Sequence, residues 1–301
     1  MHNEVGDQWK KMNTQESIVI VGIVKDAGAS LANDLLRLEL AFADFAEIHW
    51  FLVESNSSDN TVEVLDQVKN RKEKFDFVSL GNLGKPEESR TIRMAIARNR
   101  YLDEIQSQTR YSKTDYVVVA DFNHSNSDLT IESVRSCFTT TNWDVCSANQ
   151  DGPYYDIWAL RHELWQPNDC WRQLEFFKRY VKFPEKALFM AVNSKMITIP
   201  RNSSWIEVES AFGGLGIYRS QIITQANYRG VDIQGLPVCE HVPLHQELAS
   251  KGYRLFINPS LINIGRNDHS ERKSWIKIFI RILKYPIKYV RLKREFRSDT
   301  V

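Results

Sequence analysis

The chain has 301 residues, of which 43% are hydrophobic and 26% are charged, values that are ordinary for a folded globular protein and exclude a disordered chain. The four cysteines show neither CxxC nor zinc-ligand spacing, so we expect reduced thiols, as in a cytoplasmic protein. No window approaches eighteen apolar residues, and the polar segment 1–17 lacks the apolar core of a signal peptide.

The net charge of +1 hides an asymmetry, because residues 1–270 are acidic and the tail is strongly basic. Within the tail, 274–290 carries apolar residues on one helical stripe, with lysines and arginines elsewhere. A basic amphipathic helix over 274–297 suits an anionic membrane surface, in which case the protein is peripheral on the inner face of the cell membrane. Docking on its own domain or on another subunit is an equal alternative. Nucleic-acid binding is not favoured, because no further basic surface or RNA-binding motif is present.

The first 125 residues predict alternating strands and helices. Continuous apolar runs indicate strands buried on both faces, and apolar residues at helical spacing indicate helices. The expected strands are 17–26, 48–54, 75–80 and 115–123, and the expected helices are 31–46, 61–68 and 89–106. This alternation predicts right-handed crossovers and a mostly parallel sheet flanked by helices.

The pattern is looser after about residue 130. We expect strands within 143–148 and 188–200, an irregular aromatic stretch over 154–171, a segment 213–218 that follows a turn, a helix over 240–252 and a closing strand over 253–257. The predicted organisation is a polar segment 1–16, one domain over 17–270 and a basic tail 271–301. The domain divides into a nucleotide half, 17–125, and an acceptor half, 126–270.

Polar residues end three of the predicted strands. Lys25 and Asp26 end the first, Glu54 the second, and Asp121 and Asn123 the fourth. Carboxyl ends of parallel strands share one edge of a sheet, where ligands of open α/β folds bind. Singly, each acidic residue is more simply explained as a helix cap or a turn former. Taken together, these residues could bind a ribose, or a hard cation that in turn binds a diphosphate.

The helix before the fourth strand carries Arg90, Arg93, Arg98 and Asn99. Arginine suits bidentate recognition of phosphate. The alternative is a solvated helix face, which we prefer for Arg100.

Several segments in this order resemble GT-A-fold glycosyltransferases. The loop 54–61 (ESNSSDNT) resembles their acidic loop after the second strand, and Ala97-Arg98-Asn99 with Val117 to Asn123 resembles their Ala-Arg-Asn helix and Asp-x-Asp strand end. Segments 155–161, 213–218 and 239–259 are similar to fungal capsule-type α-1,3-mannosyltransferases, and the strand-end motifs are also similar to bacterial family-2-like glycosyltransferases.

The resemblance implies a role for each matching residue. Glu240 would be the catalytic base that takes the proton of the acceptor hydroxyl, or would orient the acceptor if the reaction retains configuration; a helix N-terminal acid is the structural alternative. Asp121, Asn123 and His269 would hold Mn²⁺ or Mg²⁺. The predicted nucleotide and donor set is Lys25, Glu54, Ser55, Asp59, Arg93, Arg98, Asn99, Asp121, Asp156, Trp158, Arg161, Gly213 and Gly214. His241 and His245 have a metal-compatible spacing, but we prefer packing or acceptor contacts for them.

Departures from the family pattern leave the donor sugar and metal dependence open. Asn123 replaces the usual second aspartate, and Asn56 stands where the loop usually has glycine. The expected activity is transfer of a hexose, for which mannose is one candidate, from a GDP- or UDP-sugar to a glycan or lipid-linked acceptor in surface polysaccharide synthesis. The alternatives are a sugar-1-phosphate nucleotidyltransferase and a non-catalytic membrane-surface scaffold with the same fold.

Overall fold

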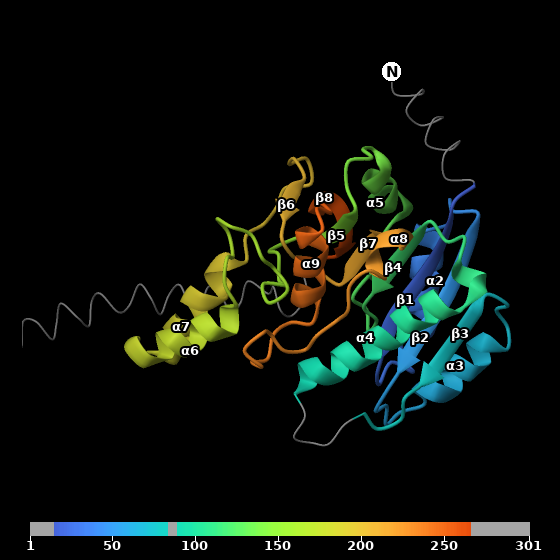
Figure 1. Cartoon of the computed structure of the whole chain (residues 1–301), viewed down its shortest axis with the longest axis horizontal. Helices are drawn as coiled ribbons and strands as arrows, with labels where there is room; N and C mark the ends of the chain where they lie inside the picture. The colour runs from blue at the N-terminus through green and yellow to red at the C-terminus, as the bar shows by residue number, and fades with distance from the viewer. Residues whose placement is uncertain (1–14, 84–88, 266–301) are drawn as a thin grey trace, which may run out of the picture.

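A computed structural model describes residues 15–83 and 89–265, so His269 and the tail 274–297 lie outside the described residues. The described chain forms a mixed α/β fold around one eight-stranded sheet, as expected (Figure 1). The strand order is β3-β2-β1-β4-β7-β5-β8-β6. The strands are β1 Ser17–Val24, β2 Glu47–Glu54, β3 Phe75–Ser79, β4 Tyr116–Ala120, β5 Val145–Gln150, β6 Ile206–Val208, β7 Leu215–Arg219 and β8 Leu255–Ile264.

The sheet is mostly parallel. Strands β1 to β4 run parallel to one another, and β5 runs parallel to β8. Strand β7 lies antiparallel between β4 and β5, and β6 is antiparallel at the edge beside β8. Strand β7 is a short buried apolar run, which the sequence pattern does not distinguish from a parallel strand, and β6 has only three residues, of which Glu207 is exposed.

The central strands are buried on both faces, as their continuous apolar sequences predict. In β1, Val19 and Val21 belong to the core cluster that includes helix α4, whereas Ile18 and Ile20 belong to the cluster that includes helix α2. Successive side chains of a strand point to opposite faces of the sheet, so one apolar run contributes residues to two hydrophobic cores.

Helices cover both faces of this sheet (Figure 1). The α-helices are α2 Leu31–Ala41, α3 Thr61–Lys69, α4 Arg90–Ser107, α5 Ile131–Arg135, α6 Cys170–Tyr180, α7 Pro184–Ala191, α8 Ser220–Ile223 and α9 His241–Ser250, and the 3-10 helices are Thr109–Tyr111, Ser136–Phe138 and Asn193–Lys195. Three expected helices match α2, α3 and α4, and the helix expected over 240–252 matches α9.

The prediction was wrong in the second half in two places. The strand expected within 188–200 is absent, because 184–191 forms α7 and 193–195 a 3-10 turn. Helix α6 begins at the end of the stretch expected to be irregular, where Asp169 caps it by accepting hydrogen bonds from the N–H groups of Trp171 and Arg172. Asp at the N-cap followed by apolar residues at helical spacing was the signal for α6.

Candidate active site

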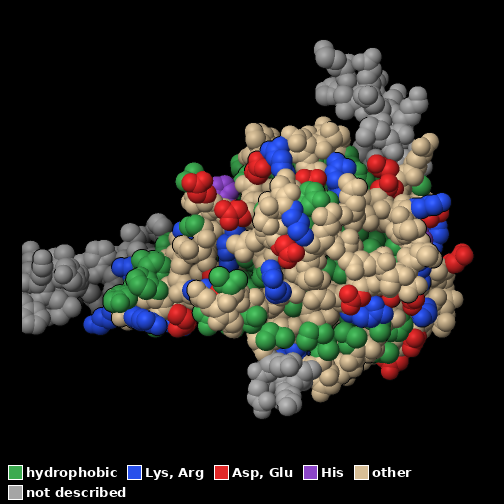
Figure 2. Space-filling view, in the orientation of Figure 1, with side chains coloured by type: hydrophobic (Ala, Val, Ile, Leu, Met, Phe, Trp, Pro, Cys, Tyr) green, Lys and Arg blue, Asp and Glu red, His purple; other side chains and the backbone are tan. Residues whose placement is uncertain are grey.

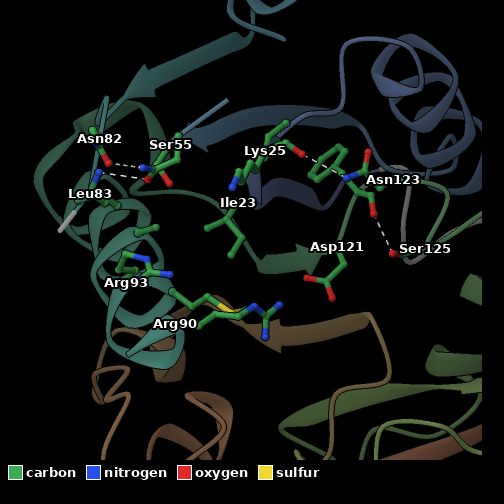
Figure 3. A pocket seen from close by; sticks show the side chains of 15 residues that line it. Ile23, Lys25, Ser55, Asn82, Leu83, Arg90, Arg93, Asp121, Asn123 and Ser125 are labelled. Carbon is green, nitrogen blue, oxygen red and sulfur yellow. Dashed lines mark hydrogen bonds between the residues drawn. The ribbon is translucent and has the colours of Figure 1, made fainter. Parts of the chain in front are cut away.

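A pocket of about 520 Å³ opens at the carboxyl edge of the parallel strands. Its lining includes three basic side chains, Lys25 after β1 and Arg90 and Arg93 on α4, together with Asp121 after β4. Figure 3 shows these side chains arriving from three different elements around one space. The pocket therefore gathers positive charge around one carboxylate, a composition suited to an anionic ligand such as a diphosphate.

A buried arginine connects this pocket to Glu240. The Arg98 Nη2 donates to Oδ1 of Asp121 at 3.1 Å, and its Nε donates to Oε1 of Glu240 at 2.8 Å. The side chains of Arg98 and Glu240 are 1% and 3% exposed, whereas that of Asp121 is 37% exposed. Asp121 is thus the member of this trio that faces the pocket, and Glu240 lies behind Arg98 and outside the pocket lining.

Aromatic rings enclose the guanidinium. The Arg98 Cζ lies 5.2 Å from the ring centroid of Phe212 and 5.7 Å from that of Tyr228. Burial raises the pKa of Asp121 above its usual value, an effect that Arg98 opposes and the Glu240 charge reinforces. The charge and hydrogen bonds of the guanidinium between the two carboxylates offset their mutual repulsion and part of the cost of burying them.

The predicted glycine pair packs directly behind Asp121. The backbone φ angles of Gly213 and Gly214 are +70° and +89°, a region that side chains disfavour. The carbonyl of Gly214 accepts the N–H of Asp121 at 2.9 Å. A Cβ on Gly213 would lie 2.7 Å from the carbonyl oxygen of Ala148. The turn therefore fixes the end of β4, and glycine is required there by sterics as well as by backbone conformation.

Asp156 holds the same turn from the other side. Its Oδ2 accepts the N–H of Gly213 at 2.9 Å. Burial raises the pKa of Asp156 to about 6, partly opposed by the Gly213 hydrogen bond. This carboxyl therefore titrates at a pH where most aspartates are already ionised.

The loop after β2 is held by its own acidic residues. Glu54 is buried and accepts hydrogen bonds from the N–H of Ser57 at 2.9 Å and from the hydroxyl of Ser79. Asp59 accepts the N–H of Gly28 at 2.9 Å. Of the predicted residues in this loop, Ser55 lines the pocket, and Glu54 and Asp59 lie outside the lining.

Asn56 also lines the pocket, and its φ of +59° explains how this residue replaces glycine. Asparagine is enriched in the left-handed region relative to other side chains. Its side chain also contacts the neighbouring loop, since Oδ1 accepts the N–H of Leu83 at 3.1 Å.

Other predicted residues make contacts within the protein. Asn99 both donates to and accepts from the backbone of Tyr228, at 2.9 and 2.8 Å. Arg161 is buried and donates to Asp169 Oδ2 at 3.1 Å, and the Trp158 indole N–H donates to the same oxygen at 2.9 Å. The Asn99 contacts join α4 to the chain after α8, and the Arg161 and Trp158 contacts fix the segment between β5 and α6. The donor-binding role of these three residues remains a prediction.

Few side chains among the described residues are placed to bind a cation. No group of three or more His, Cys, Asp or Glu side chains is arranged to hold a metal ion within 15–83 and 89–265. The Asn123 amide donates to the carbonyl of Lys25 at 3.2 Å, and its Oδ1 accepts from the Ser30 hydroxyl at 3.3 Å. Asp121 offers one carboxylate to the pocket. These residues fit a cation that takes a single protein carboxylate and completes its shell with water and phosphate oxygens, as Mg²⁺ does.

Several lining residues were not singled out from the sequence. Ile23, Asn82, Leu83, Met94 and Ser125 line the pocket without belonging to any motif. Their positions next to predicted strand and helix ends were the available signal. The expected packing role of the histidine pair is confirmed, since His241 stacks on Phe212 at 3.9 Å between centroids and His245 contacts the Ser210 and Tyr218 hydroxyls.

No protein-family model and no curated protein matches this chain. Solved structures do. A mannosyltransferase from Pyrobaculum calidifontis, in complex with GDP-Man and Mn²⁺, aligns at 10% identity with a TM-score of 0.46, over 87% of this chain and 63% of its own. TarS from S. aureus, in complex with UDP-GlcNAc, aligns at 14% identity with a TM-score of 0.42, over 84% of this chain and 59% of its own. The chain thus spans less than two thirds of both.

Glucosyl-3-phosphoglycerate synthase from Mycobacterium tuberculosis, in complex with Mn²⁺, UDP and phosphoglyceric acid, aligns at 11% identity with a TM-score of 0.40, over 87% of this chain and 71% of its own. Proteins that bind nucleotide sugars or nucleoside diphosphates are therefore among the structures similar to this chain.

Proposed function

We propose that this protein is a GT-A-type glycosyltransferase that moves a sugar from a nucleoside diphosphate to a hydroxyl of a glycan or lipid-linked acceptor. The observation that carries the proposal is the pocket at the carboxyl edge of the sheet, in which Lys25, Arg90 and Arg93 surround Asp121. Positive side chains fixed around a leaving diphosphate stabilise the charge that develops as the glycosidic bond to phosphate breaks.

The proposed donor position follows from the lining. The base and ribose would lie toward Ser55 and Asn56 on the loop after β2, and the diphosphate would lie between α4 and the end of β1. The sugar would then lie near Asp121 and the Gly213–Gly214 turn. A bound Mg²⁺ or Mn²⁺ would offset part of the diphosphate charge at Asp121. The cation-binding residues of this chain would be Asp121 and, among those outside the described ranges, His269.

Glu240 is the proposed base, and its chemistry depends on Arg98. A base must accept the acceptor's hydroxyl proton as the new bond to the anomeric carbon forms. Arg98 engages Oε1 of Glu240 at 2.8 Å, and Oε2, which the Cys239 thiol contacts at 3.9 Å, would be the oxygen that takes that proton. The same arginine contacts Asp121, so the donor side and the acceptor side of the site share one positioning residue.

The hydrogen bonds of the loop after β1 support a glycosyltransferase rather than a nucleotidyltransferase. A nucleotidyltransferase of the expected alternative kind would use free N–H groups in this loop to bind phosphate. Here the N–H groups of Asp26, Ala27 and Gly28 donate to side chains of the loop after β2, at 3.1, 2.8 and 2.9 Å. They are therefore engaged within the protein.

Donor hydrolysis by the purified protein tests the proposal and separates an enzyme from a scaffold. UDP-, GDP-, CDP- and dTDP-sugars are incubated with the protein, and release of the nucleoside diphosphate is measured. We expect release from one nucleotide class and its loss in Asp121→Ala. Absence of release from every donor, with and without acceptor glycans, would contradict the proposal.

A further inference from the structure

Helices α6 and α7 form a hairpin that projects at the end of the molecule opposite to β2 and β3 (Figure 1). Three large side chains of α6 are exposed there. Trp171 is 43% exposed, Phe176 is 56% exposed and Tyr180 is 74% exposed. Aromatic residues this exposed are costly on a surface that meets only water, and large side chains are normally buried on folding.

Two of the exposed aromatic residues form a stripe on an otherwise anchored helix, and Trp171 packs separately against Trp158. Phe176 and Tyr180 are four residues apart on α6, with ring centroids 5.0 Å from each other. The opposite side of α6 places Cys170 and Leu174 in the core cluster of the sheet. The helix is therefore held by one face while its aromatic stripe faces outward.

Positive charge surrounds this stripe. Residues 170–191 contain five basic and two acidic side chains, although residues 1–270 as a whole are acidic. All five basic side chains are exposed: Arg172 and Lys178 pair with Asp232 and Glu175, and the others are Arg179, Lys182 and Lys186. Figure 2 shows hydrophobic and basic side chains side by side over this part of the molecule. The hairpin is thus a basic, aromatic projection on an acidic body.

We propose that the α6–α7 hairpin binds an anionic lipid surface, with Phe176 and Tyr180 entering the headgroup region and the basic side chains contacting lipid phosphates. Aromatic rings with polar edges and flanking lysines or arginines are the side chains that favour a membrane interface. Two other binding partners would fit the positive charge of the hairpin less well than a lipid surface does. A second copy of the hairpin, or the basic segment 274–297 of this chain, would bring like charges together.

Helix α2 provides a matched comparison within the same protein. Leu36 and Leu40 are also four residues apart and are 54% and 57% exposed. Their neighbours on the helix include Asp34 and Glu39, which an anionic surface repels. If exposed apolar area were sufficient for lipid binding, both helices would bind an anionic lipid surface. The proposal predicts that α6 binds it and α2 does not.

Vesicle co-sedimentation of the full chain tests the proposal. The vesicles are phosphatidylcholine with and without phosphatidylserine. We expect binding that requires phosphatidylserine, and about tenfold weaker binding for Phe176→Ser/Tyr180→Ser and for Arg179→Glu/Lys182→Glu. The control Leu36→Ser/Leu40→Ser binds as the unaltered protein does. Equal binding by the hairpin variants, or no binding by the unaltered protein, would overturn the proposal.

A site-specific probe separates the hairpin from the tail. All four native cysteines are buried, so Tyr180→Cys can be labelled selectively with an environment-sensitive fluorophore. We expect its emission to shift to the blue on addition of phosphatidylserine vesicles, whereas the same label at Leu40→Cys stays in water. A tail that binds lipid without the hairpin would leave both labels unchanged, which would refute the assignment. None of these residues lines the nucleotide pocket, so the outcome is independent of the proposed activity.

Discussion

At the scale of single residues, Arg98 bears the largest electrostatic role, because it is buried between Asp121 and Glu240. Removing one partner from such a buried network leaves an uncompensated charge. We expect Arg98→Met to lower the free energy of unfolding by about 3–5 kcal/mol, measured by chemical denaturation. Arg98→Lys keeps the charge but loses the planar guanidinium, so its free energy of unfolding should lie between those of Arg98→Met and the native protein. A stability loss as large in the Lys variant as in the Met variant would contradict this reading of the arginine.

Glu240→Gln separates base catalysis from positioning. Glutamine keeps an oxygen that accepts the hydrogen bond from Arg98, but it does not take a proton from an acceptor hydroxyl. We expect the rate of transfer to fall by about 10²- to 10⁴-fold while the affinity for nucleoside diphosphate stays within a few-fold. Transfer at close to the native rate would show that Glu240 only holds Arg98 in place.

Asp156 links stability to pH. Its pKa in the folded state, about 6, lies above the value of an ordinary aspartate, so the folded protein binds the proton more tightly than the unfolded chain does. The contribution of Asp156 to stability is therefore favourable below about pH 4 and is lost as pH rises through 6. Asp156→Asn should be more stable than the native protein by about 1–3 kcal/mol at pH 7.5, and the difference should shrink toward pH 4. If the difference in stability between Asp156→Asn and the native protein were the same at pH 7.5 and pH 4, the raised pKa of Asp156 would be contradicted.

At the scale of elements, the turn before β7 fixes the end of β4. Gly213→Ala places a Cβ against the Ala148 carbonyl in a left-handed conformation. We expect a loss of about 1–3 kcal/mol in the free energy of unfolding and weaker nucleotide binding, because the turn accepts the N–H of Asp121. The matched control is Gly235→Ala, which has a similar φ of +75° but no atom within 4 Å of its Cβ. Equal losses in both variants would mean that backbone conformation, and not packing behind Asp121, sets the cost.

The sequence predicted the elements of the nucleotide half well, because β1, β2 and β4 are largely apolar runs ended by polar residues. Strand β8 was predicted too short, since the expected closing strand 253–257 ends before Pro259, whereas β8 continues through this proline to Ile264. The position of β7 between β4 and β5 depends on long-range pairing that periodicity does not encode.

The site was predictable in part for the same reason. Strand-end residues such as Lys25 and Asp121 share one edge because parallel strands do. The buried contact of Arg98 with Glu240, 142 positions apart in the chain, was not predictable from spacing. For Glu54 the structure shows the turn-forming role that was the simpler explanation of the residue taken singly, and Asp59 holds the loop in the same way; a carboxylate that accepts backbone N–H groups has the same sequence signal as one that binds ribose.

At the scale of the whole molecule, the pocket lies at the carboxyl edge of the strands, and the proposed lipid-binding hairpin projects from the other half of the sheet (Figure 1). Within residues 15–83 and 89–265, the structure contains no helix that is both long enough and apolar enough to span a bilayer. The hairpin and the pocket belong to one folded unit built on a single sheet.

The central claim is that Lys25, Arg90 and Arg93 form the binding site of a nucleoside diphosphate. Thermal unfolding with UDP, GDP, CDP and dTDP, each with and without Mn²⁺, measures it most directly, because a ligand that prefers the folded state raises the melting temperature by mass action. We predict a rise with one of the four nucleotides that is lost in Arg90→Glu/Lys25→Glu, while Arg37→Glu, on the exposed face of α2, keeps it. No rise with any nucleotide, or an equal rise in the pocket variant, would contradict the account.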